Sequence, residues 1–400
     1  MRYRLPITAV LSLAALLNAA PAGAEDKAFR GYIESLWPTA KGAKISRATF
    51  DAAFAVAGDP DPAVLKLAAN QPEFTSTTSE YLAKAVTPAR IATGREMLAA
   101  RADLLSAIES RYGVDRHILL AIWGMESNFG KDKGGMHVMR SLATLAYKGR
   151  RRDYARPQIV AALKILQGGV VRSLSFTGSW AGAMGHTQFI PTSYLAYAVD
   201  WTGDKKRDIW NSEADALAST ANYLDKSNWS AAVPWGWEVK LPSGFNNALI
   251  GRQNMRSIGA WAKMGIKPMR GNFRSLDSKS FLMIPQGLDG PVFLVTQNFN
   301  AIRAYNDSHS YAVAVGYLAD RIRGMGEIVA PWPAQNIGLT YSERVEMQKR
   351  LIGKGFATGG TDGRFGARTY EAIIAFQKSR NLDPNGVPDR TLLLQLRKGS

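Results

Sequence analysis

Glu126 is a carboxylate in apolar surroundings, because it stands between Trp123, Met125 and Phe129 near the end of an apolar run. Desolvation disfavours the charged form of a carboxylate and raises its pKa, which suits a group that must donate a proton near neutral pH. Gly130 follows, and a glycine there would end the helix and leave Glu126 facing a cleft. Taken alone, the pattern also fits a surface carboxylate or one half of an ion pair.

A second stretch, residues 178–194, mixes small residues with polar ones. Small residues allow the backbone to approach a bulky ligand closely. Within this stretch, Ser179 and Gln188 can form hydrogen bonds with the hydroxyl and N-acetyl groups of a sugar. A tightly packed loop that binds no ligand explains the same composition equally well.

A third stretch, residues 303–312, contains two tyrosines and an asparagine. Tyr305 and Tyr311 have the size and the hydroxyl groups to line a cleft. Asn306 fits either substrate binding or the capping of a helix, and its residue type alone favours capping.

Several other chemistries are excluded by what the sequence lacks. The four histidines are scattered and form no His-Glu-x-x-His motif, so a zinc peptidase is not expected. The sequence contains neither a Gly-x-Ser-x-Gly elbow nor a P-loop. It contains no cysteine, which excludes disulfides, a thiol nucleophile and a lipoprotein anchor.

The elements that must position these residues are mainly helical. Apolar residues at helical spacing predict helices over 48–57, 88–112, 117–125, 157–167, 215–226, 255–264 and 310–324. Ser46 and Asp115 stand where caps of two of these helices are needed. One small β-hairpin is predicted where residues 281–285 and 292–296 flank a turn at 287–290.

The two ends of the chain differ in composition from the middle. Residues 1–24 have a positive start, an apolar run and the small residues Ala22-Gly23-Ala24, which predict a signal peptide cleaved after Ala24. A proline-containing linker is predicted at 331–338. It separates a large domain at 25–330 from a small C-terminal domain at 339–400, whose three helices are expected over 342–353, 366–380 and 389–397.

The net charge of +17 is strongly basic, and removal of residues 1–24, which hold two arginines and no acid, leaves +15. A basic protein is attracted to anionic polymers. For an exported protein these are the carboxylate-bearing peptidoglycan and anionic lipids rather than nucleic acid. Solubility alone is the other explanation of this charge.

The three stretches together resemble the lytic transglycosylase B family of murein transglycosylases, over about residues 29–325. The motifs that carry the resemblance are Gly124-Met125-Glu126-Ser127, residues 178–194, residues 218–223, Tyr305-Asn306 and Tyr311, in this order and spacing. The resemblance implies a lysozyme-like α+β catalytic domain. Trp123 and Trp180, which lie inside these motifs, are the tryptophans best placed to stack on a sugar.

The resemblance also implies a reaction and a set of site residues. Glu126 would be the only catalytic acid and base, and the other residues at family positions around the saccharide are Ser179, Gln188, Tyr223, Tyr305, Asn306 and Tyr311. The enzyme would cleave the β-1,4 bond between N-acetylmuramic acid and N-acetylglucosamine and leave 1,6-anhydro-muramic acid ends. The alternatives are a hydrolytic muramidase, which needs a second carboxylate, and a wall-binding protein without activity.

The family's best-known members carry a calcium loop of EF-hand type, and the corresponding segment here is degenerate. Asp200, Asp204 and Asp215 keep acidic positions, but Lys205 replaces the glycine of the sharp turn. Three consecutive cations, residues 205–207, would repel a metal ion, so we expect no cofactor and a loop ordered by ion pairs.

The tail resembles the peptidoglycan-binding domain of the three-helix type. Its motifs are residues 345–351, Asp362-Gly363-Arg364-Phe365-Gly366, Ala375-Phe376-Gln377 and Asn385-Gly386. The expected partner is therefore the glycan of peptidoglycan, the expected location is the periplasm, and a monomer is the default expectation.

Overall fold

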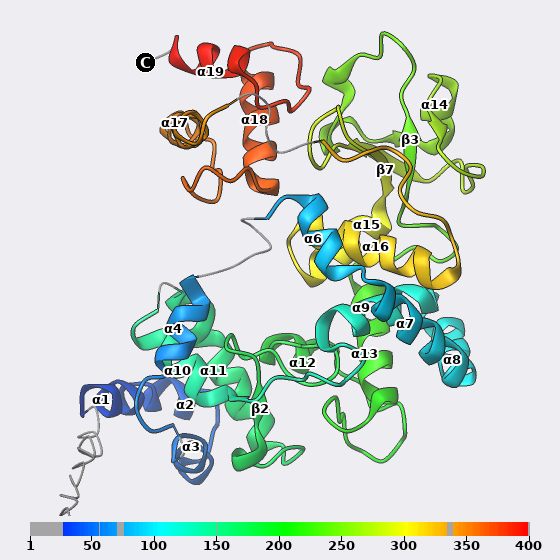
Figure 1. Cartoon of the computed structure of the whole chain (residues 1–400). Coiled ribbons are helices and arrows are strands. Elements are labelled where there is room, and N and C mark those ends of the chain that lie inside the picture. The colour runs from blue at the N-terminus through cyan, green and yellow to red at the C-terminus, as the bar shows by residue number, and fades with distance from the viewer. Residues whose placement is uncertain (1–26, 56, 70–75, 150, 334–338, 399–400) are drawn as a thin grey trace, which may run out of the picture.

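The computed structural model describes residues 27–55, 57–69, 76–149, 151–333 and 339–398 (Figure 1). The signal peptide predicted at 1–24 and residues 334–338 of the predicted linker lie outside these ranges. Most described residues are helical, which confirms the mainly α class. In the part of the chain that the structure describes, no helix combines the length and the apolar character needed to cross a membrane.

One group of helices surrounds a core that contains Phe50, Leu142 and Tyr194. Its helices are α1 (Lys27–Ser35), α2 (Trp37–Gly42), α3 (Arg47–Phe54), α4 (Pro62–Ala69), α10 (Val138–Tyr147), α11 (Arg152–Gln167) and α12 (Pro191–Tyr197). The side chain of Ser46 accepts a hydrogen bond from the Thr49 amide and caps α3, as predicted. The short strands β1 (Met136–His137) and β2 (Thr177–Gly178), with the 3-10 helix η1 (Ser173–Ser175), complete this group.

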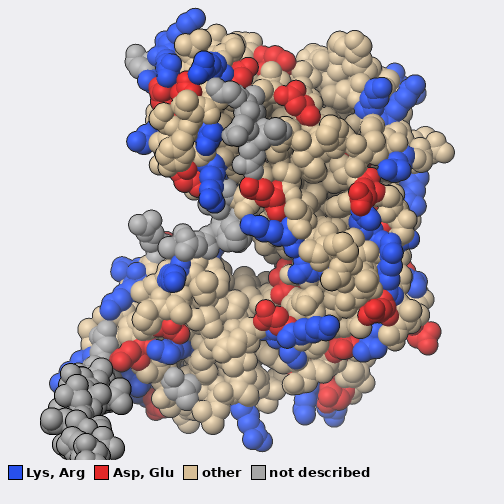
Figure 2. Space-filling view, viewed as in Figure 1, with Lys and Arg blue, Asp and Glu red and all other residues tan. Residues whose placement is uncertain are grey.

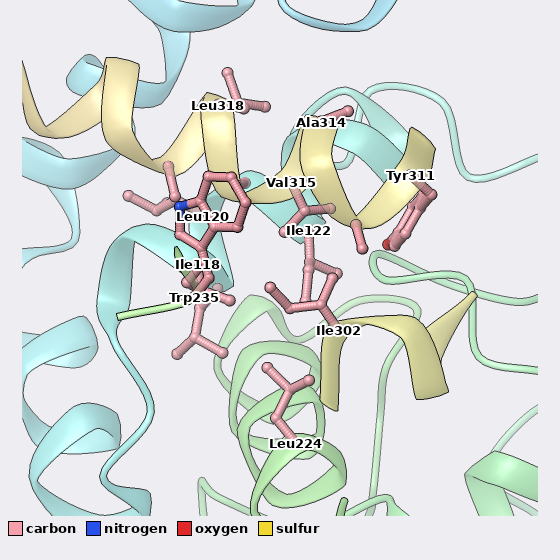
Figure 3. Packing of buried hydrophobic residues seen from close by; sticks show 14 of the residues in the cluster. Ile118, Leu120, Ile122, Leu224, Trp235, Ile302, Tyr311, Ala314, Val315 and Leu318 are labelled. Carbon is pink, nitrogen blue, oxygen red and sulfur yellow. The ribbon is translucent and has the colours of Figure 1, made fainter. Parts of the chain in front are cut away.

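A second group of helices packs around α9, the helix that carries Glu126. Its members are α6 (Thr78–Ala85), α7 (Pro88–Ala100), α8 (Ala102–Tyr112), α9 (Arg116–Ser127), α13 (Glu213–Lys226), α15 (Gln297–Tyr305) and α16 (His309–Arg323). Figure 3 shows Ile118 and Leu120 of α9 packed with Trp235 and with Val315 and Leu318 of α16. Burying each such aliphatic side chain contributes roughly 1.5 to 3 kcal/mol, so this core holds α9 and α16 firmly together.

The single helix predicted over 88–112 is wrong, because the chain breaks there into α7 and α8. Arg101, between them, leaves the helical conformation at φ −122°. Its guanidinium group forms an ion pair with Glu213 of α13 at 2.6 Å. This contact joins distant parts of the chain, and local periodicity does not reveal it.

A five-stranded antiparallel sheet packs against these helices, with strand order β4-β6-β7-β3-β5 (Figure 1). Its elements are β3 (Gly236–Lys240), β4 (Arg256–Ser257), β5 (Lys267–Pro268), β6 (Lys279–Met283) and β7 (Val292–Thr296), with helix α14 (Ile258–Lys263) and the 3-10 helices η2 (Asn247–Leu249) and η3 (Arg252–Asn254). The predicted hairpin is confirmed as β6 and β7, in which Phe281 pairs with Val295. Alternate residues face opposite sides. Phe281 and Val295 therefore enter the core around α9, whereas Leu282 and Leu294 enter a separate core with Trp261.

The C-terminal domain consists of α17 (Tyr341–Gly353), α18 (Ala367–Ser379) and α19 (Arg390–Arg397), close to the predicted helices. They enclose a small core of their own, which includes Leu351, Phe376 and Leu393. Buried Gln348 accepts a hydrogen bond from the Gly363 amide at 2.7 Å and so fixes the turn before α18. Figure 1 shows this domain beside the sheet and close to α6.

Asp320 of α16 is a mostly buried carboxyl group. It accepts a hydrogen bond from the Trp235 indole Nε1 at 2.9 Å. Burial raises the pKa of Asp320 to about 6, from an ordinary value of 3.8. A raised pKa means that the folded protein favours the protonated carboxyl more than the unfolded chain does. Its contribution to stability is therefore complete below about pH 4 and is lost as the pH rises through 6.

We expect Asp320→Asn to remove this pH dependence, because asparagine still accepts the Trp235 hydrogen bond and carries no charge at any pH. The shift in pKa corresponds to about 3 kcal/mol at most between pH 4 and pH 7. Urea unfolding at both pH values measures it, with the exposed Asp277→Asn as a matched control. Equal pH dependence in wild type and Asp320→Asn would contradict the assignment.

Candidate active site

Helix α9 carries Glu126 in its last turn. Its first turn is fixed by Asp115, whose carboxylate accepts a hydrogen bond from the His117 amide at 2.9 Å. Residues 118–124 are buried, so the helix is anchored on every side before it reaches Glu126, which is half-buried. The predicted cap at Asp115 is confirmed.

The end of α9 differs from the sequence-based expectation. The helix ends at Ser127, and Asn128 takes the left-handed conformation at φ 49°, so Gly130 is not the residue that ends it. The Ser127 hydroxyl donates a hydrogen bond to the His186 carbonyl at 2.5 Å and accepts one from the Gly130 amide at 2.9 Å. These bonds fix the C-terminal end of α9, which carries Glu126, to the stretch 178–194.

Trp123 lies beneath this junction. It is completely buried, and its Nε1 donates a hydrogen bond to Nδ1 of His186 at 3.1 Å. A role in stacking on a sugar is therefore wrong for Trp123. Burial lowers the pKa of His186, which keeps its ring neutral and able to accept this bond.

Tyr311 of α16 binds Glu126 directly. Its hydroxyl group donates a hydrogen bond to Oε1 of Glu126 at 2.6 Å. Burial raises the pKa of Tyr311 well above 10, and the nearby charge of Glu126 raises it further. The phenol therefore stays protonated and remains a hydrogen-bond donor at neutral pH.

The stretch 178–194 forms tight turns beside Glu126. The Ser179 hydroxyl accepts hydrogen bonds from the amides of Ala181 and Ala183, at 3.3 and 3.1 Å. The Gln188 side-chain amide donates to the carbonyl groups of Lys133 and Gly185, at 3.1 and 2.8 Å. Both side chains thus hold the turns and also line the cleft described below.

The glycines of this stretch serve packing within the protein. A Cβ on Gly178 would lie 2.2 Å from the Ala183 carbonyl oxygen, and one on Gly185 would lie 2.4 Å from the Ile209 carbonyl oxygen. At these two glycines the close approach is between two segments of backbone, whereas the small residues Ala181 and Ala183 line the cleft.

The third stretch completes the site through a group of aromatic rings. The Tyr305 hydroxyl donates to the Thr187 carbonyl at 2.5 Å, and its ring lies 4.9 Å from that of Tyr223. Tyr223 donates to the Ala304 carbonyl at 2.5 Å. Both rings pack against Phe189, so Tyr223 supports Tyr305 from behind.

Asn306 follows α15 in an extended conformation and lines the cleft. The cap of α16 is instead Ser308, whose hydroxyl accepts a hydrogen bond from the Tyr311 amide at 3.3 Å. Capping of α16 by Asn306, which residue type favours, is therefore wrong.

These residues surround a cleft of about 560 Å³. Five of the seven residues expected around the saccharide line it: Glu126, Ser179, Gln188, Tyr305 and Asn306. Tyr311 reaches it through Glu126, and Tyr223 lies behind Tyr305. Figure 2 shows the molecule hollowed between the C-terminal domain and the helical group around α10 and α11.

Trp180, a tryptophan of the motifs, also lines the cleft. Other lining residues are not singled out by the motifs and include Arg151, Tyr154, Asp307 and, from the C-terminal domain, Arg368. Asp307 is a second carboxylate, but its side chain is 84% exposed and it forms an ion pair with Arg303 at 2.5 Å. The guanidinium group of Arg151 lies over the rings of Tyr154 and Trp180, at 4.9 and 5.8 Å from their centroids.

The loop expected to correspond to a calcium site brings its acids together. Asp200, Asp204 and Asp215 each place one carboxylate oxygen within 4.8 Å of the others. Lys205 takes the left-handed conformation at φ 70°, so the absence of glycine does not prevent the turn. The amino-acid sequence predicts that ion pairs order this loop, but hydrogen bonds from backbone amides do so: Asp215 accepts them from the amides of residues 201, 202 and 208.

Comparison with protein families covers both parts of the chain. Residues 28–320 match the transglycosylase SLT domain, and residues 340–396 match the putative peptidoglycan binding domain. The membrane-bound lytic murein transglycosylase B of Escherichia coli (strain K12) is 31% identical over 276 residues, which are 65% of this chain and 73% of that protein.

Solved structures agree with this result. SltB3 from Pseudomonas aeruginosa in complex with NAG-anhNAM-pentapeptide is 46% identical, with a TM-score of 0.81 over 92% of this chain and 99% of that chain. The Escherichia coli lytic transglycosylase Slt35 in complex with calcium is 27% identical, with a TM-score of 0.61 over 74% of this chain and 92% of that one. The lysozyme-like transglycosylase fold predicted from the sequence is confirmed.

The matched domain spans most of the chain, and the order and geometry of the site agree with it. The chain therefore belongs to the SLT-domain lytic transglycosylases and is a peptidoglycan lytic transglycosylase with a C-terminal peptidoglycan-binding domain.

Proposed function

We propose that Glu126 is the single acid and base of this lytic transglycosylase. The observation that carries the proposal is the hydrogen bond of 2.6 Å from the buried Tyr311 hydroxyl to Glu126, which holds the carboxyl group at the wall of the cleft. A fixed donor of this kind orients one oxygen of the carboxyl group and so sets the direction in which it exchanges a proton.

In the first step, Glu126 donates its proton to the oxygen that bridges N-acetylmuramic acid and N-acetylglucosamine. The bond from C1 to that oxygen breaks, and the departing sugar leaves as an alcohol. Positive charge develops at C1, and the acetamido oxygen of the substrate relieves it. No carboxylate nucleophile is needed, which fits the ion pair that engages Asp307 with Arg303.

In the second step, the ionised Glu126 takes the proton from the C6 hydroxyl of the same muramic acid. The C6 oxygen then attacks C1 and closes the 1,6-anhydro ring, so Glu126 is protonated again and no water is consumed. The SltB3 complex with NAG-anhNAM-pentapeptide supports this product, because it contains an anhydro-muramic acid.

Around the saccharide, we propose that Ser179, Gln188, Tyr305 and Asn306 contact the substrate, since all four line the cleft. Tyr311 and Tyr223 act through other residues. Tyr311 orients the carboxyl group of Glu126. Tyr223 packs against the ring of Tyr305 and so holds Tyr305 in its position at the cleft.

We expect Glu126→Gln to bind peptidoglycan sacculi as wild type does but to cleave them at least about a thousandfold more slowly, because glutamine cannot exchange a proton. Muropeptides released from sacculi are measured by mass spectrometry. Wild type should release products that are lighter by one water than hydrolytic products. Substantial cleavage by Glu126→Gln would rule out Glu126 as the single acid and base.

Asp307→Asn is the matched control, because it neutralises the other carboxylate that lines the cleft. A single acid and base predicts that this variant keeps its rate within about fivefold of wild type. If Asp307→Asn were as inactive as Glu126→Gln, and the products carried ordinary reducing ends, a two-carboxylate muramidase would be the better description.

We propose that the loop around Asp200 and Asp204 needs no calcium. Three backbone amides already occupy the carboxylate of Asp215, and residues 205–207 add three positive charges beside it. We expect 1 mM Ca²⁺ to change the melting temperature by less than about 2 °C. A ligand stabilises the folded state appreciably only when its concentration is well above its Kd for that state. A larger rise that EGTA reverses and Asp204→Asn abolishes would show that calcium binds.

We also propose that the mature protein is periplasmic, begins at Glu25 and is a monomer. The basic start, the apolar run and the small residues before Glu25 support export, and peptidoglycan as the substrate agrees with that location. Amino-terminal sequencing of the exported protein and its mass by light scattering test both points, and an uncleaved terminus or a dimer mass would contradict them.

A further inference from the structure

Helix α18 of the C-terminal domain has two different contact faces. Ala372, Ile373 and Phe376 point into the core of the domain. The opposite face contains Arg368, Glu371, Ile374 and Lys378, at intervals of three and four residues. Positions three or four residues apart lie on one side of a helix. These four residues therefore form a single stripe, which we call the docking stripe.

Three members of the docking stripe contact the catalytic domain. Glu371 forms an ion pair with Nδ1 of His309 at 2.5 Å, and Ile374 packs against the apolar core that contains Leu282 and Ile250. Lys378 donates a hydrogen bond to the Ile250 carbonyl at 2.5 Å. The stripe thus seats α18 on the catalytic domain along nearly its whole length.

Contacts beyond the stripe strengthen the docking. The Leu288 amide donates to the Asn385 carbonyl at 2.9 Å, and the Asn247 side chain donates to Asp383 at 2.8 Å. Contacts from three separate segments of the catalytic domain fix both the position and the rotation of α18.

The fourth member, Arg368, lies at the end of the stripe that is nearest to the catalytic carboxylate. It is exposed and lines the same cleft as Glu126. One turn further along α18, Glu371 holds His309 at the start of α16, two residues before Tyr311. The docking of α18 therefore gives Arg368 a defined place in the cleft.

The cleft carries a second cation, Arg151, whose guanidinium group is held over Tyr154 and Trp180. A neutral glycan strand offers little to two guanidinium groups, but the stem peptides on muramic acid carry carboxylates. Guanidinium groups bind carboxylates with two parallel hydrogen bonds. The anionic part of the substrate is thus the group that these arginines fit.

We propose that Arg368 of the C-terminal domain is a specificity residue of the active site, which binds a stem-peptide carboxylate of the strand being cut, an inference that rests on the peptidoglycan cleavage proposed for Glu126. The C-terminal domain thereby forms one side of the catalytic cleft, in addition to binding peptidoglycan. Arg151 supports the same recognition from the catalytic domain.

The test compares two soluble substrates in the full-length protein: glycan oligomers that carry stem peptides, and the same oligomers after an amidase has removed the peptides. We expect Arg368→Gln to raise KM about tenfold on the peptide-bearing oligomers, because one charge-assisted hydrogen-bonded pair is lost. On peptide-free oligomers KM should change less than about twofold, and kcat should be unchanged on both.

Arg364→Gln is the matched control, since Arg364 is an exposed arginine of the same domain outside the cleft. It should leave KM within about twofold of wild type on both substrates. An unchanged KM of Arg368→Gln on peptide-bearing oligomers would overturn the proposal. An equal loss on both substrates would also overturn it, because that pattern indicates disturbed docking.

Failure of the proposed catalytic function would look different. In that case wild type would release no anhydro products even from peptide-free oligomers, or Glu126→Gln would still release them. If wild type cleaves both substrates and Arg368→Gln matches it on both, only the role of Arg368 is lost.

Discussion

The hydrogen bond between Tyr311 and Glu126 is the interaction on which the arrangement of this enzyme depends. It joins two helices, α9 and α16, that are distant in sequence and share one continuous apolar core. Because the Tyr311 phenol is buried, it stays protonated and needs an acceptor. A small shift of α16 along α9 would leave this hydroxyl without a partner inside the core. Packing of the helices and orientation of the Glu126 carboxyl group are therefore the same constraint, satisfied by the same side chains.

The remaining contacts of the site serve to hold the stretch 178–194 against these two helices. Ser127 reaches it from α9 through the His186 carbonyl, and Tyr305 reaches it from α15 through the Thr187 carbonyl. Both acceptors are backbone carbonyls of neighbouring residues, so the turn at residues 186–187 is held by hydrogen bonds from both α9 and α15. Most polar side chains of the motifs are thus engaged with backbone. Each donor must therefore meet a carbonyl whose position is set by another element of the fold.

The sequence predicts those parts of the fold that are decided locally. The caps at Ser46 and Asp115 and the hairpin of β6 and β7 follow from residue types at short range. Where long-range contacts decide, prediction from the sequence is wrong or incomplete. The break at Arg101 depends on an ion pair with Glu213, and the two-residue strands β4 and β5 exist only because longer strands pair with them. The motifs identify Glu126 and most residues around it, whereas nothing local to Arg368 indicates that it reaches the same cleft.

The two faces of α18 bear on what the C-terminal domain does. If the domain only tethered the enzyme to peptidoglycan, α18 would need one apolar face for the core of its own domain. A flexible linker to the catalytic domain would then be sufficient. Here Glu371, Ile374 and Lys378 form a second face that is matched to the catalytic domain. An ion pair and a half-buried lysine cost desolvation and side-chain entropy, so they add little affinity by themselves and mainly fix orientation. Fixed orientation matters when the bound peptidoglycan and the cleaved bond belong to one polymer, because the domain that binds the strand then also determines which bond reaches the cleft.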